Sequence, residues 1–397
     1  MKCIHTLRLQ LLTLLAVLIS ATSPLPVSAE VTLGNERPEL YLPLLKGKRV
    51  GLLSNHTGID HAGIHTADKL KAEGVDLRVL FSPEHGFRGT ADAGEKVGSG
   101  RDAATGLPVV SLYGGKKVDL PAIMDSIDVV AVDIQDVGLR FYTYYITMLR
   151  LMNSAARAGK EVVVLDRPNP NGMSVDGPVL DMELQSGVGK LPVPVLHGMT
   201  LGELALMING EGWLDGGRKV KLSVVPAEGY THSTRYELLN MPSPNLKSMH
   251  AIYLYPSTCL FEGTPMSLGR GTDHPFEVYG HPQMKRGDYR FTPRSMEGAK
   301  HPPLEGRLCR GRDLRAVSDS AAIAGGVNLE YVIDAYRNMP SAMQPKFFTP
   351  FFDKLIGTRD VARQIRAGKT AAAIRASWQP ALDSFRVRRA PYLLYPE

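Results

Sequence analysis

The sequence predicts an α/β protein, with a mostly parallel sheet followed by a smaller α+β domain. Short apolar segments alternate with segments of helical spacing, an order typical of parallel sheets with right-handed crossovers. Four apolar segments end in dense polar clusters; they are residues 49–53, 77–81, 129–132 and 162–165. Because ligands bind beyond the carboxyl ends of parallel strands, we expect these clusters to form one polar cleft, as in an enzyme.

The apolar spacing predicts the other elements of this first part. Two more strands are expected at residues 108–112 and 219–225, and helices at residues 65–72, 120–126, 144–158 and 201–208. Thr200 precedes the last of these helices and Glu203 follows three residues later, which is the pattern of a capping box. The Gly-rich stretch 86–106 fits neither a helix nor a strand.

The pattern changes near residue 240. Prolines divide the next stretch into loops and extended pieces: Pro242, Pro244, Pro256 and Pro265. Beyond them we expect short strands, a helix near residues 329–337 and a long helical segment over residues 359–384. We therefore expect a catalytic domain at residues 30–250 and a smaller α+β domain at residues 251–397.

The chain begins with the features of an export signal. Lys2 and Arg8 precede an apolar stretch at residues 9–19, and the small residues Ser28 and Ala29 resemble a cleavage site. The apolar stretch is short for a membrane span, and residue 30 is Glu rather than a lipid-bearing Cys. We expect residues 1–29 to be removed, leaving a periplasmic or secreted protein with no permanent membrane anchor.

Composition argues against nucleic acid as a partner. Removing residues 1–29 takes away Lys2 and Arg8 and no acid, so the formal charge falls from +6 to +4. No long run of Lys and Arg occurs. Two cysteines remain, Cys259 and Cys309, which either form one disulfide or lie apart in the core. The sequence does not indicate the oligomeric state.

Several common chemistries lack their motifs. The chain has no phosphate-binding G-x-x-x-x-G-K-[ST], no G-x-G-x-x-G after the first strand, no G-x-S-x-G elbow and no H-E-x-x-H. His56, His85 and Asp133 would form a metal site only if three strand ends converged. We therefore predict neither a metal nor a cofactor.

Carboxylates are the remaining candidates for catalysis. Glu84 follows a strand, and its apolar flanks Phe81 and Phe87 favour the neutral acid that a proton donor needs. Its alternative role is a helix cap or a loop salt bridge. Glu262 has a similar setting, with an apolar run before it and glycine after it. Asp133 opens a polar cluster that leads to several tyrosines, and aromatic rings beside amides and carboxylates suit a sugar site.

These residues belong to blocks that resemble one bacterial family, the peptidoglycan-recycling exo-β-N-acetylmuramidases. The blocks cover residues 55–58, 82–89, 133–138, 140–144, 166–172, 244–246 and 255–264. The resemblance implies a Rossmann-like N-terminal domain, a smaller C-terminal domain and an active-site cleft between them. It also implies release of N-acetylmuramic acid from the non-reducing end of peptidoglycan-derived glycans or muropeptides. Residues 265–268 depart from the family pattern, which bears on fine specificity.

Within these blocks Glu84 is the candidate general acid, Glu262 the first candidate for the second catalytic group, and Asp133 the next. The lactyl carboxylate of muramic acid calls for an arginine, for which the candidates are Arg88, Arg140 and Arg270. The other candidate substrate-binding residues are Asn55, His56, His85, Gln135, Tyr142, Tyr144, Asn169, Asn171 and Asn245. Inversion, retention and participation of the substrate's acetamido group all stay open.

Two other classes of protein fit the same pattern. A non-catalytic periplasmic protein that binds muropeptides or sugars would also place two α/β domains around a polar cleft. An exported metal-dependent hydrolase would use His56 and His85. An exo-acting enzyme also needs a cleft that is closed at one end, and we expect residues 86–106 and 240–265 to border it.

Overall fold

The computed structural model describes residues 31–84, 86–87, 100–113 and 118–397. The expected export signal, His85, Arg88 and most of the stretch 86–106 lie outside the described residues. No described helix is both long and apolar enough to cross a membrane.

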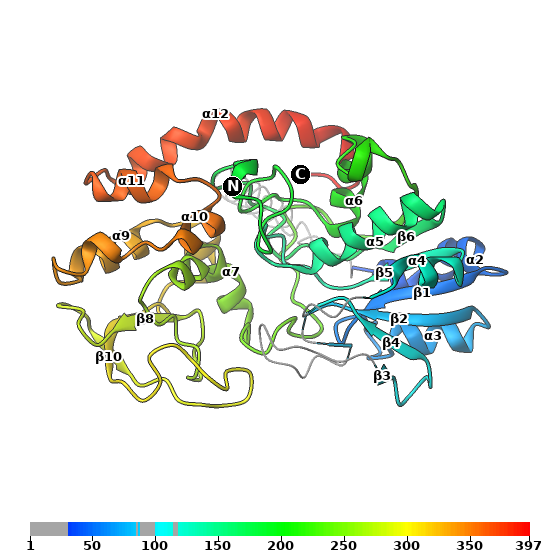
Figure 1. Cartoon of the computed structure of the whole chain (residues 1–397), viewed down its shortest axis with the longest axis horizontal. Helices are drawn as coiled ribbons and strands as arrows, with labels where there is room; N and C mark the ends of the chain where they lie inside the picture. Colours follow the sequence, from blue (N-terminus) through cyan, green and yellow to red (C-terminus); the bar gives the residue numbers. More distant parts are fainter. Residues whose placement is uncertain (1–30, 85, 88–99, 114–117) are drawn as a thin grey trace, which may run out of the picture. The chain divides into compact units, whose positions relative to one another are not determined.

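A seven-stranded sheet forms the first part of the chain, in the order β3-β4-β2-β1-β5-β6-β7 (Figure 1). All neighbouring strands are parallel except β3, which is antiparallel to β4. The strands are β1 (Arg49–Ser54), β2 (Asp76–Ser82), β3 (Gly100–Arg101), β4 (Pro108–Ser111), β5 (Val129–Asp133), β6 (Glu161–Leu165) and β7 (Lys221–Val225). The predicted α/β fold is confirmed.

Register places the polar strand ends together. Ser54 at the end of β1 pairs with Asp133 at the end of β5, and Leu53 pairs with Phe81 of β2. The chain leaves β1 for β2 on one side, whereas β5 lies on the other side of β1. Such a switch point opens a crevice at the carboxyl edge of a parallel sheet.

Helices cover the sheet because its strands are apolar on both faces. They are α2 (Pro38–Leu45), α3 (Thr66–Ala72), α4 (Leu120–Asp125), α5 (Tyr144–Ala158) and α6 (Leu201–Gly210). Alternate residues of β1, Val50 and Leu52, share a core with α2 and α3. The predicted capping box is present: Thr200 Oγ1 accepts the Glu203 N–H at 3.2 Å, and Glu203 Oε2 accepts the Thr200 N–H at 2.8 Å.

A smaller second domain contains a three-stranded antiparallel sheet, in the order β8-β10-β9. Its strands are β8 (Val278–His281), β9 (Tyr289–Phe291) and β10 (Cys309–Asp313). Its helices are α7 (Met249–Thr258), α8 (Asp319–Gly325), α9 (Glu330–Asn338), α10 (Pro350–Ile356), α11 (Asp360–Arg366) and α12 (Ala371–Arg389). Short 3-10 helices complete the described chain: η1 (Gly34–Glu36), η2 (Met182–Leu184), η3 (Asp215–Gly217), η4 (Cys259–Gly263), η5 (Gln344–Lys346) and η6 (Ala390–Tyr392).

Two expectations for this domain are corrected. The long helical segment predicted at residues 359–384 is two helices, because Gly368 adopts a φ of 78° and Thr370 caps a new helix through the Ala373 N–H. The stretch around Pro256 is helical rather than extended, since α7 continues through this proline and buries both its faces. The cysteine question is also settled: Cys259 and Cys309 are free and separately buried.

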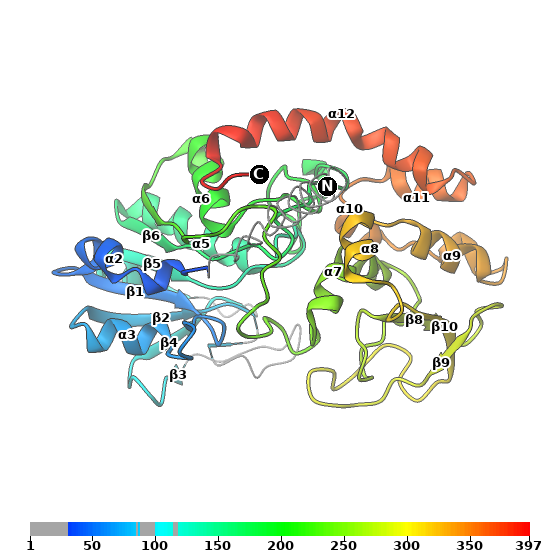
Figure 2. The ribbon, with the colours of Figure 1, turned by 180° about the vertical axis from the view of Figure 1, so that it is seen from behind.

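The end of the chain returns to the first sheet. In Figures 1 and 2, α12 extends from α11 toward α6. Tyr395 Oη donates to Asp166 Oδ2 at 2.7 Å and accepts the Ala227 N–H at 2.9 Å. The Leu394 N–H donates to Glu203 Oε1 at 2.8 Å. Residues late in the sequence therefore satisfy buried carboxylates at the ends of β6 and α6.

This anchoring predicts the effect of Tyr395→Phe. The substitution leaves the Ala227 N–H without its acceptor and removes one of the two hydroxyl donors to the buried Asp166 Oδ2, the other being Thr200, so we expect the free energy of unfolding to fall by about 1–3 kcal/mol. Tyr392→Phe is the matched control, because its hydroxyl bonds Glu211 at a more exposed position. Chemical denaturation measures both variants, and equal losses would contradict the assignment.

Candidate functional site

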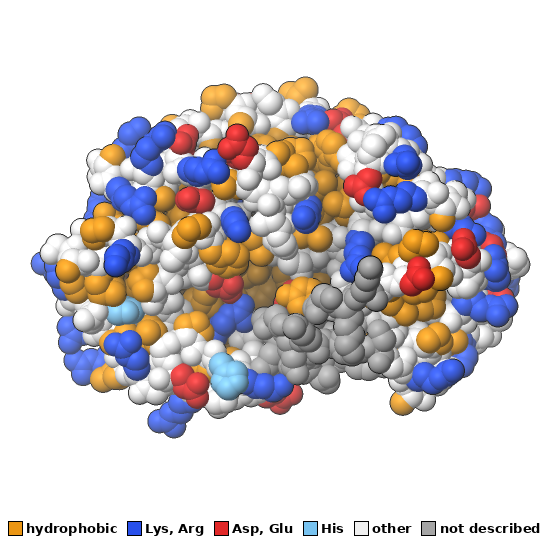
Figure 3. All heavy atoms as spheres, viewed as in Figure 1, with side chains coloured by type: hydrophobic (Ala, Val, Ile, Leu, Met, Phe, Trp, Pro, Cys, Tyr) orange, Lys and Arg blue, Asp and Glu red, His pale blue; other side chains and the backbone are white. Residues whose placement is uncertain are grey.

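A cavity of about 1040 Å³ is lined by residues from both domains. From the first domain come the loops after β2 and β5, and from the second come α7, η4 and the segments around residues 264–276 and 298–304. Figure 3 shows the hollow in the surface, with acidic and basic side chains inside it. Glu84 and Glu262 both line this cavity.

Glu84 lies in the turn that follows β2. Thr143 Oγ1, at the start of α5, donates a hydrogen bond of 2.9 Å to Glu84 Oε2. Tyr113 is also close to this carboxylate: burial and the nearby Glu84 together raise the pKa of the Tyr113 phenol. Phe81 and Phe87, its predicted apolar flanks, are buried. The carboxyl group is thus held at the cavity by two hydroxyl-bearing residues.

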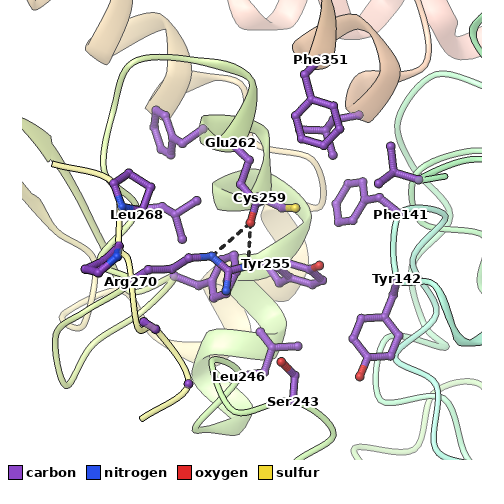
Figure 4. A pocket seen from close by; sticks show the side chains of 18 of the residues that line it. Phe141, Tyr142, Ser243, Leu246, Tyr255, Cys259, Glu262, Leu268, Arg270 and Phe351 are labelled. Carbon is purple, nitrogen blue, oxygen red and sulfur yellow. Dashed lines mark hydrogen bonds and ion pairs between the residues drawn. The ribbon is translucent and has the colours of Figure 1, made fainter. Parts of the chain in front are cut away.

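Glu262 lies in η4 and forms an ion pair with Arg270 inside the cavity. Oε1 of Glu262 is 2.7 Å from Arg270 Nη2 and 3.3 Å from Nε (Figure 4). The guanidinium also stacks over the Phe276 ring, 5.0 Å from its centre. Burial opposes the charge of Arg270, but Glu262 outweighs it and raises the pKa of the guanidinium. The pair therefore keeps a fixed cation and a fixed carboxylate facing the cavity.

Aromatic rings form the wall between the two carboxylates. Tyr255 makes edge-to-face contacts with Phe141 at 5.2 Å and with Phe276 at 4.8 Å between ring centres. Tyr142 and Tyr144 continue this wall, and their hydroxyls donate to the Pro242 carbonyl at 2.9 and 2.6 Å. Burial raises the pKa of both phenols. They line the cavity as predicted, but their hydroxyls are occupied by the protein.

The predicted amide ligands bind loops rather than the cavity. Asn55 donates to Tyr144 Oη at 2.8 Å, and Gln135 donates to the Pro168 carbonyl at 2.7 Å. Three asparagine side chains donate to backbone carbonyls of other loops: Asn169 to that of Met199, Asn171 to that of Val137 and Asn245 to that of Gly298. Only the last of these carbonyls belongs to a cavity-lining residue. These side chains shape the edge of the sheet, and the structure does not bring them to the cavity lining.

Asp133 has a structural setting that corrects its expected catalytic role. Its carboxylate is fully buried and pairs with Arg167, at 2.5 Å to Nε and 3.0 Å to Nη2. Thr66 and Asn35 donate to the same carboxylate. With all these partners and no place in the cavity lining, Asp133 is a support for the sheet edge.

Arg140 is likewise not available to a substrate carboxylate. Its guanidinium donates to the carbonyls of Pro178, Val193 and Leu355 at 2.7–2.9 Å and is fully buried. Burial lowers the pKa of Arg140 to about 10. Gly357 adopts a φ of 87° beside it, and a Cβ there would meet the guanidinium at 2.5 Å. Of the three candidate arginines, Arg270 is the one that the structure places at the cavity, and Arg88 lies outside the described residues.

His56 lies near the cavity wall without joining its lining. Its Nε2 is 2.9 Å from the Met241 carbonyl oxygen. Among the described residues, no group of three His, Cys, Asp or Glu side chains is arranged to hold a metal ion. His85 lies outside these residues, so the three-residue metal site of the sequence analysis is not tested.

Several cavity residues were missed by the sequence analysis. Thr143 belongs to a block that resembles the family, but a lone threonine in a sequence carries little signal of a site. His301, Pro302 and Pro303 line the cavity from a distant loop. Nothing in their local pattern indicates that this loop folds back to the cavity.

Comparisons with known proteins agree with this arrangement. Residues 50–250 match the family described as "Exo-beta-N-acetylmuramidase NamZ, N-terminal", and residues 253–395 match its C-terminal counterpart. The peptidoglycan beta-N-acetylmuramidase NamZ of Bacillus subtilis (strain 168) is 37% identical over 372 residues, covering 89% of each chain.

Two crystal structures of DUF1343 family proteins from Bacteroides fragilis NCTC 9343 have the same fold. One has a TM-score of 0.86 and 50% identity, covering 93% of this chain and 100% of the other. The second has a TM-score of 0.75 and 30% identity, covering 92% and 99%.

Asp136 and Asp133 lie near the same sheet edge, but replacing each by asparagine should change the free energy of unfolding in opposite directions. Asp136 is buried; its Oδ1 accepts the Gly138 N–H at 2.8 Å, and its Oδ2 has no hydrogen-bond partner in the described part of the chain. Burial, offset only in part by the Gly138 N–H and other backbone donors, raises the pKa of Asp136 to about 7. The folded state thus holds this proton more tightly than the unfolded state, and the resulting stability is lost as the pH rises through 7.

Asp136→Asn imitates the protonated form. We expect it to raise the free energy of unfolding at pH 8 by about 1 kcal/mol or more and to have little effect below about pH 4, where the carboxyl is protonated in the folded and the unfolded state alike. Asp133→Asn is the contrast, because it breaks a buried ion pair and should cost about 3 kcal/mol at both pH values. Chemical denaturation at the two pH values measures the free energy of unfolding of both variants. An Asp136→Asn effect that does not change with pH would refute the buried-acid interpretation.

Proposed function

Since this chain belongs to the exo-β-N-acetylmuramidase family, and is therefore a glycosidase, we propose that it releases N-acetylmuramic acid from the non-reducing end of peptidoglycan-derived glycans or muropeptides. The observation that carries this proposal is the pair of carboxylates, Glu84 and Glu262, on one cavity with an aromatic wall. Glycoside hydrolysis needs an acid for the leaving oxygen and a second group for the oxocarbenium-like centre.

Glu84 is the proposed general acid. Its setting supports this role because Thr143 fixes one carboxyl oxygen and because the Tyr113 phenol lies beside the carboxylate. It would protonate the glycosidic oxygen as the bond to the anomeric carbon breaks. The leaving sugar then departs as a neutral alcohol.

Glu262 is the proposed second group. Arg270 fixes its orientation, so its negative charge lies ready for the developing positive charge on the sugar ring. Nη1 of Arg270 makes no hydrogen bond to any described residue, and this free edge of the guanidinium suits the lactyl carboxylate of muramic acid. One arginine would thus serve both catalysis and recognition.

The proposal includes where the enzyme is located in the cell. Peptidoglycan lies outside the cytoplasmic membrane, and the basic and apolar pattern of residues 1–29 is that of a cleavable export signal. We infer that the mature enzyme is periplasmic or secreted.

A product analysis tests the activity. Purified protein is incubated with N-acetylmuramyl-N-acetylglucosamine and with the corresponding N-acetylglucosamine disaccharide. We expect release of free N-acetylmuramic acid and at least roughly tenfold higher kcat/KM for the muramyl substrate, since an unmade charge-assisted bond costs about 1.5–3 kcal/mol. Arg270→Met should remove most of this preference. An intact disaccharide would favour a binding protein, and larger products from longer glycans would indicate an endo-acting enzyme.

Glu84→Gln tests the general acid. The substitution keeps the size of the side chain but removes the transferable proton, so kcat should fall by at least roughly 10²-fold while the protein stays folded. A substrate with an activated phenolic leaving group needs less protonation and should lose much less. Glu73→Gln, at an exposed position outside the cavity lining, serves as the control. Wild-type turnover by Glu84→Gln on both substrates would rule out the assignment.

A further inference from the structure

A second cavity, of about 950 Å³, adjoins the first. The two share three lining residues, Tyr113, Thr143 and Gly187, and the first two of these flank Glu84. Its other walls come from α4, α5 and the segments at residues 185–191 and 213–215. In Figure 3 apolar side chains gather on the surface over α4. A substrate bound at Glu84 therefore has a second cavity within reach.

The lining of this second cavity differs from that of a sugar site. Its apolar side chains are mostly aliphatic: Leu112, Leu120, Met124, Ile146, Leu149 and Leu191. Sugar rings stack best on aromatic faces, which here are limited to Tyr113 and Trp213. Aliphatic walls are better suited to methyl-bearing side chains than to the hydroxyl-covered rim of a sugar.

Lys190 gives the cavity a cation on a firmly held backbone. The Lys190 N–H donates to Tyr145 Oη at 3.0 Å, and its carbonyl accepts from Gln185 Nε2 at 3.0 Å, so its backbone is held firmly. Its ammonium makes no ion pair or hydrogen bond with any residue that the structure describes. By contrast, Arg157 pairs with Asp215 and Arg150 donates to the Leu112 carbonyl. Of these three cations, Lys190 is the one whose side chain has no partner among the described residues, so its ammonium can meet an incoming anion.

We propose that this second cavity binds the stem peptide of peptide-bearing muramyl substrates. The inference rests on the proposed function, because the stem peptide is amide-linked to the lactyl group of muramic acid. In such a substrate the lactyl carboxyl is a neutral amide, and its carbonyl oxygen takes the place of the carboxylate as the acceptor for Arg270. Lys190 would pair with a peptide carboxylate, and the aliphatic wall would cover the methyl groups of its alanines. The proximity of the cavity to Glu84, the cations Lys190 and Arg150 in its lining and the aliphatic residues all match an acidic, alanine-containing peptide.

Kinetics with two substrates test the proposal. N-acetylmuramyl-N-acetylglucosamine is compared with the same disaccharide carrying L-alanyl-D-isoglutamate on its lactyl group. We expect Lys190→Met to lower kcat/KM for the peptide-bearing substrate by roughly tenfold and to change the peptide-free value less than twofold. Lys46→Met, at an exposed position outside both cavities, is the matched control. Equal losses on both substrates would overturn the proposal.

Ser154→Trp provides a second, independent variant. Ser154 lines the second cavity from α5 but not the first, so a tryptophan there fills the peptide site and leaves Lys190 in place. We expect the same selective loss of roughly tenfold. If both variants instead slow the cleavage of a longer peptide-free glycan, the cavity binds sugars and the proposal fails.

Direct binding separates this inference from the proposed function. Calorimetry with muramyl dipeptide should detect binding to the wild-type protein and at least roughly tenfold weaker binding to Lys190→Met. That result supports the peptide site even if the disaccharide is not cleaved. Equal affinity of the two proteins for muramyl dipeptide refutes it, even if the disaccharide is cleaved.

Discussion

The buried ion pair between Asp133 and Arg167 holds the carboxyl edge of the sheet together. It joins the end of β5 to the loop after β6, and Arg167 reaches further to the Ile59 carbonyl at 2.8 Å. Thr66 and Asn35 complete the coordination of the carboxylate from two other segments. A buried pair of this kind is weak as a source of net stability, but it is costly to break on one side. It therefore specifies one arrangement of the loops at this edge.

The cavity that Glu84 and Glu262 line depends on that arrangement. The chain that leaves Asp133 continues through Arg140 to the aromatic wall and to Thr143, which positions Glu84. Arg140 fixes this segment to the second domain by binding the Leu355 carbonyl of α10. The positive charge of Arg140 is stabilised by three backbone carbonyl dipoles, with no carboxylate partner among the described residues. The consequence is that the segment leading to the aromatic wall is tied to both domains through one buried side chain.

The sequence predicted the layout of the sheet and two of the cavity's carboxylates, but it misassigned most of the amides. Strands are predictable because their apolar runs follow directly from burial, and strand ends converge because parallel strands share a direction. Asn169, Asn171 and Gln135 look like ligands in the sequence. In the structure they satisfy backbone carbonyls of tight buried loops, a need that is invisible without the fold. Arg140 was misassigned for the same reason, since its three carbonyl partners are far apart in the chain.

The return of the chain's last residues to the first sheet has a consequence for biosynthesis. Asp166 and Glu203 are made long before Tyr395 and Leu394, which satisfy them. A nascent chain that already contains every described strand of the large sheet thus still lacks the donors that Tyr395 and Leu394 supply to these two carboxylates. Domains usually fold in order as they are synthesised. In this protein the last donors to these two carboxylates become available only after the second domain has been made, so the contacts of the first domain are complete only then.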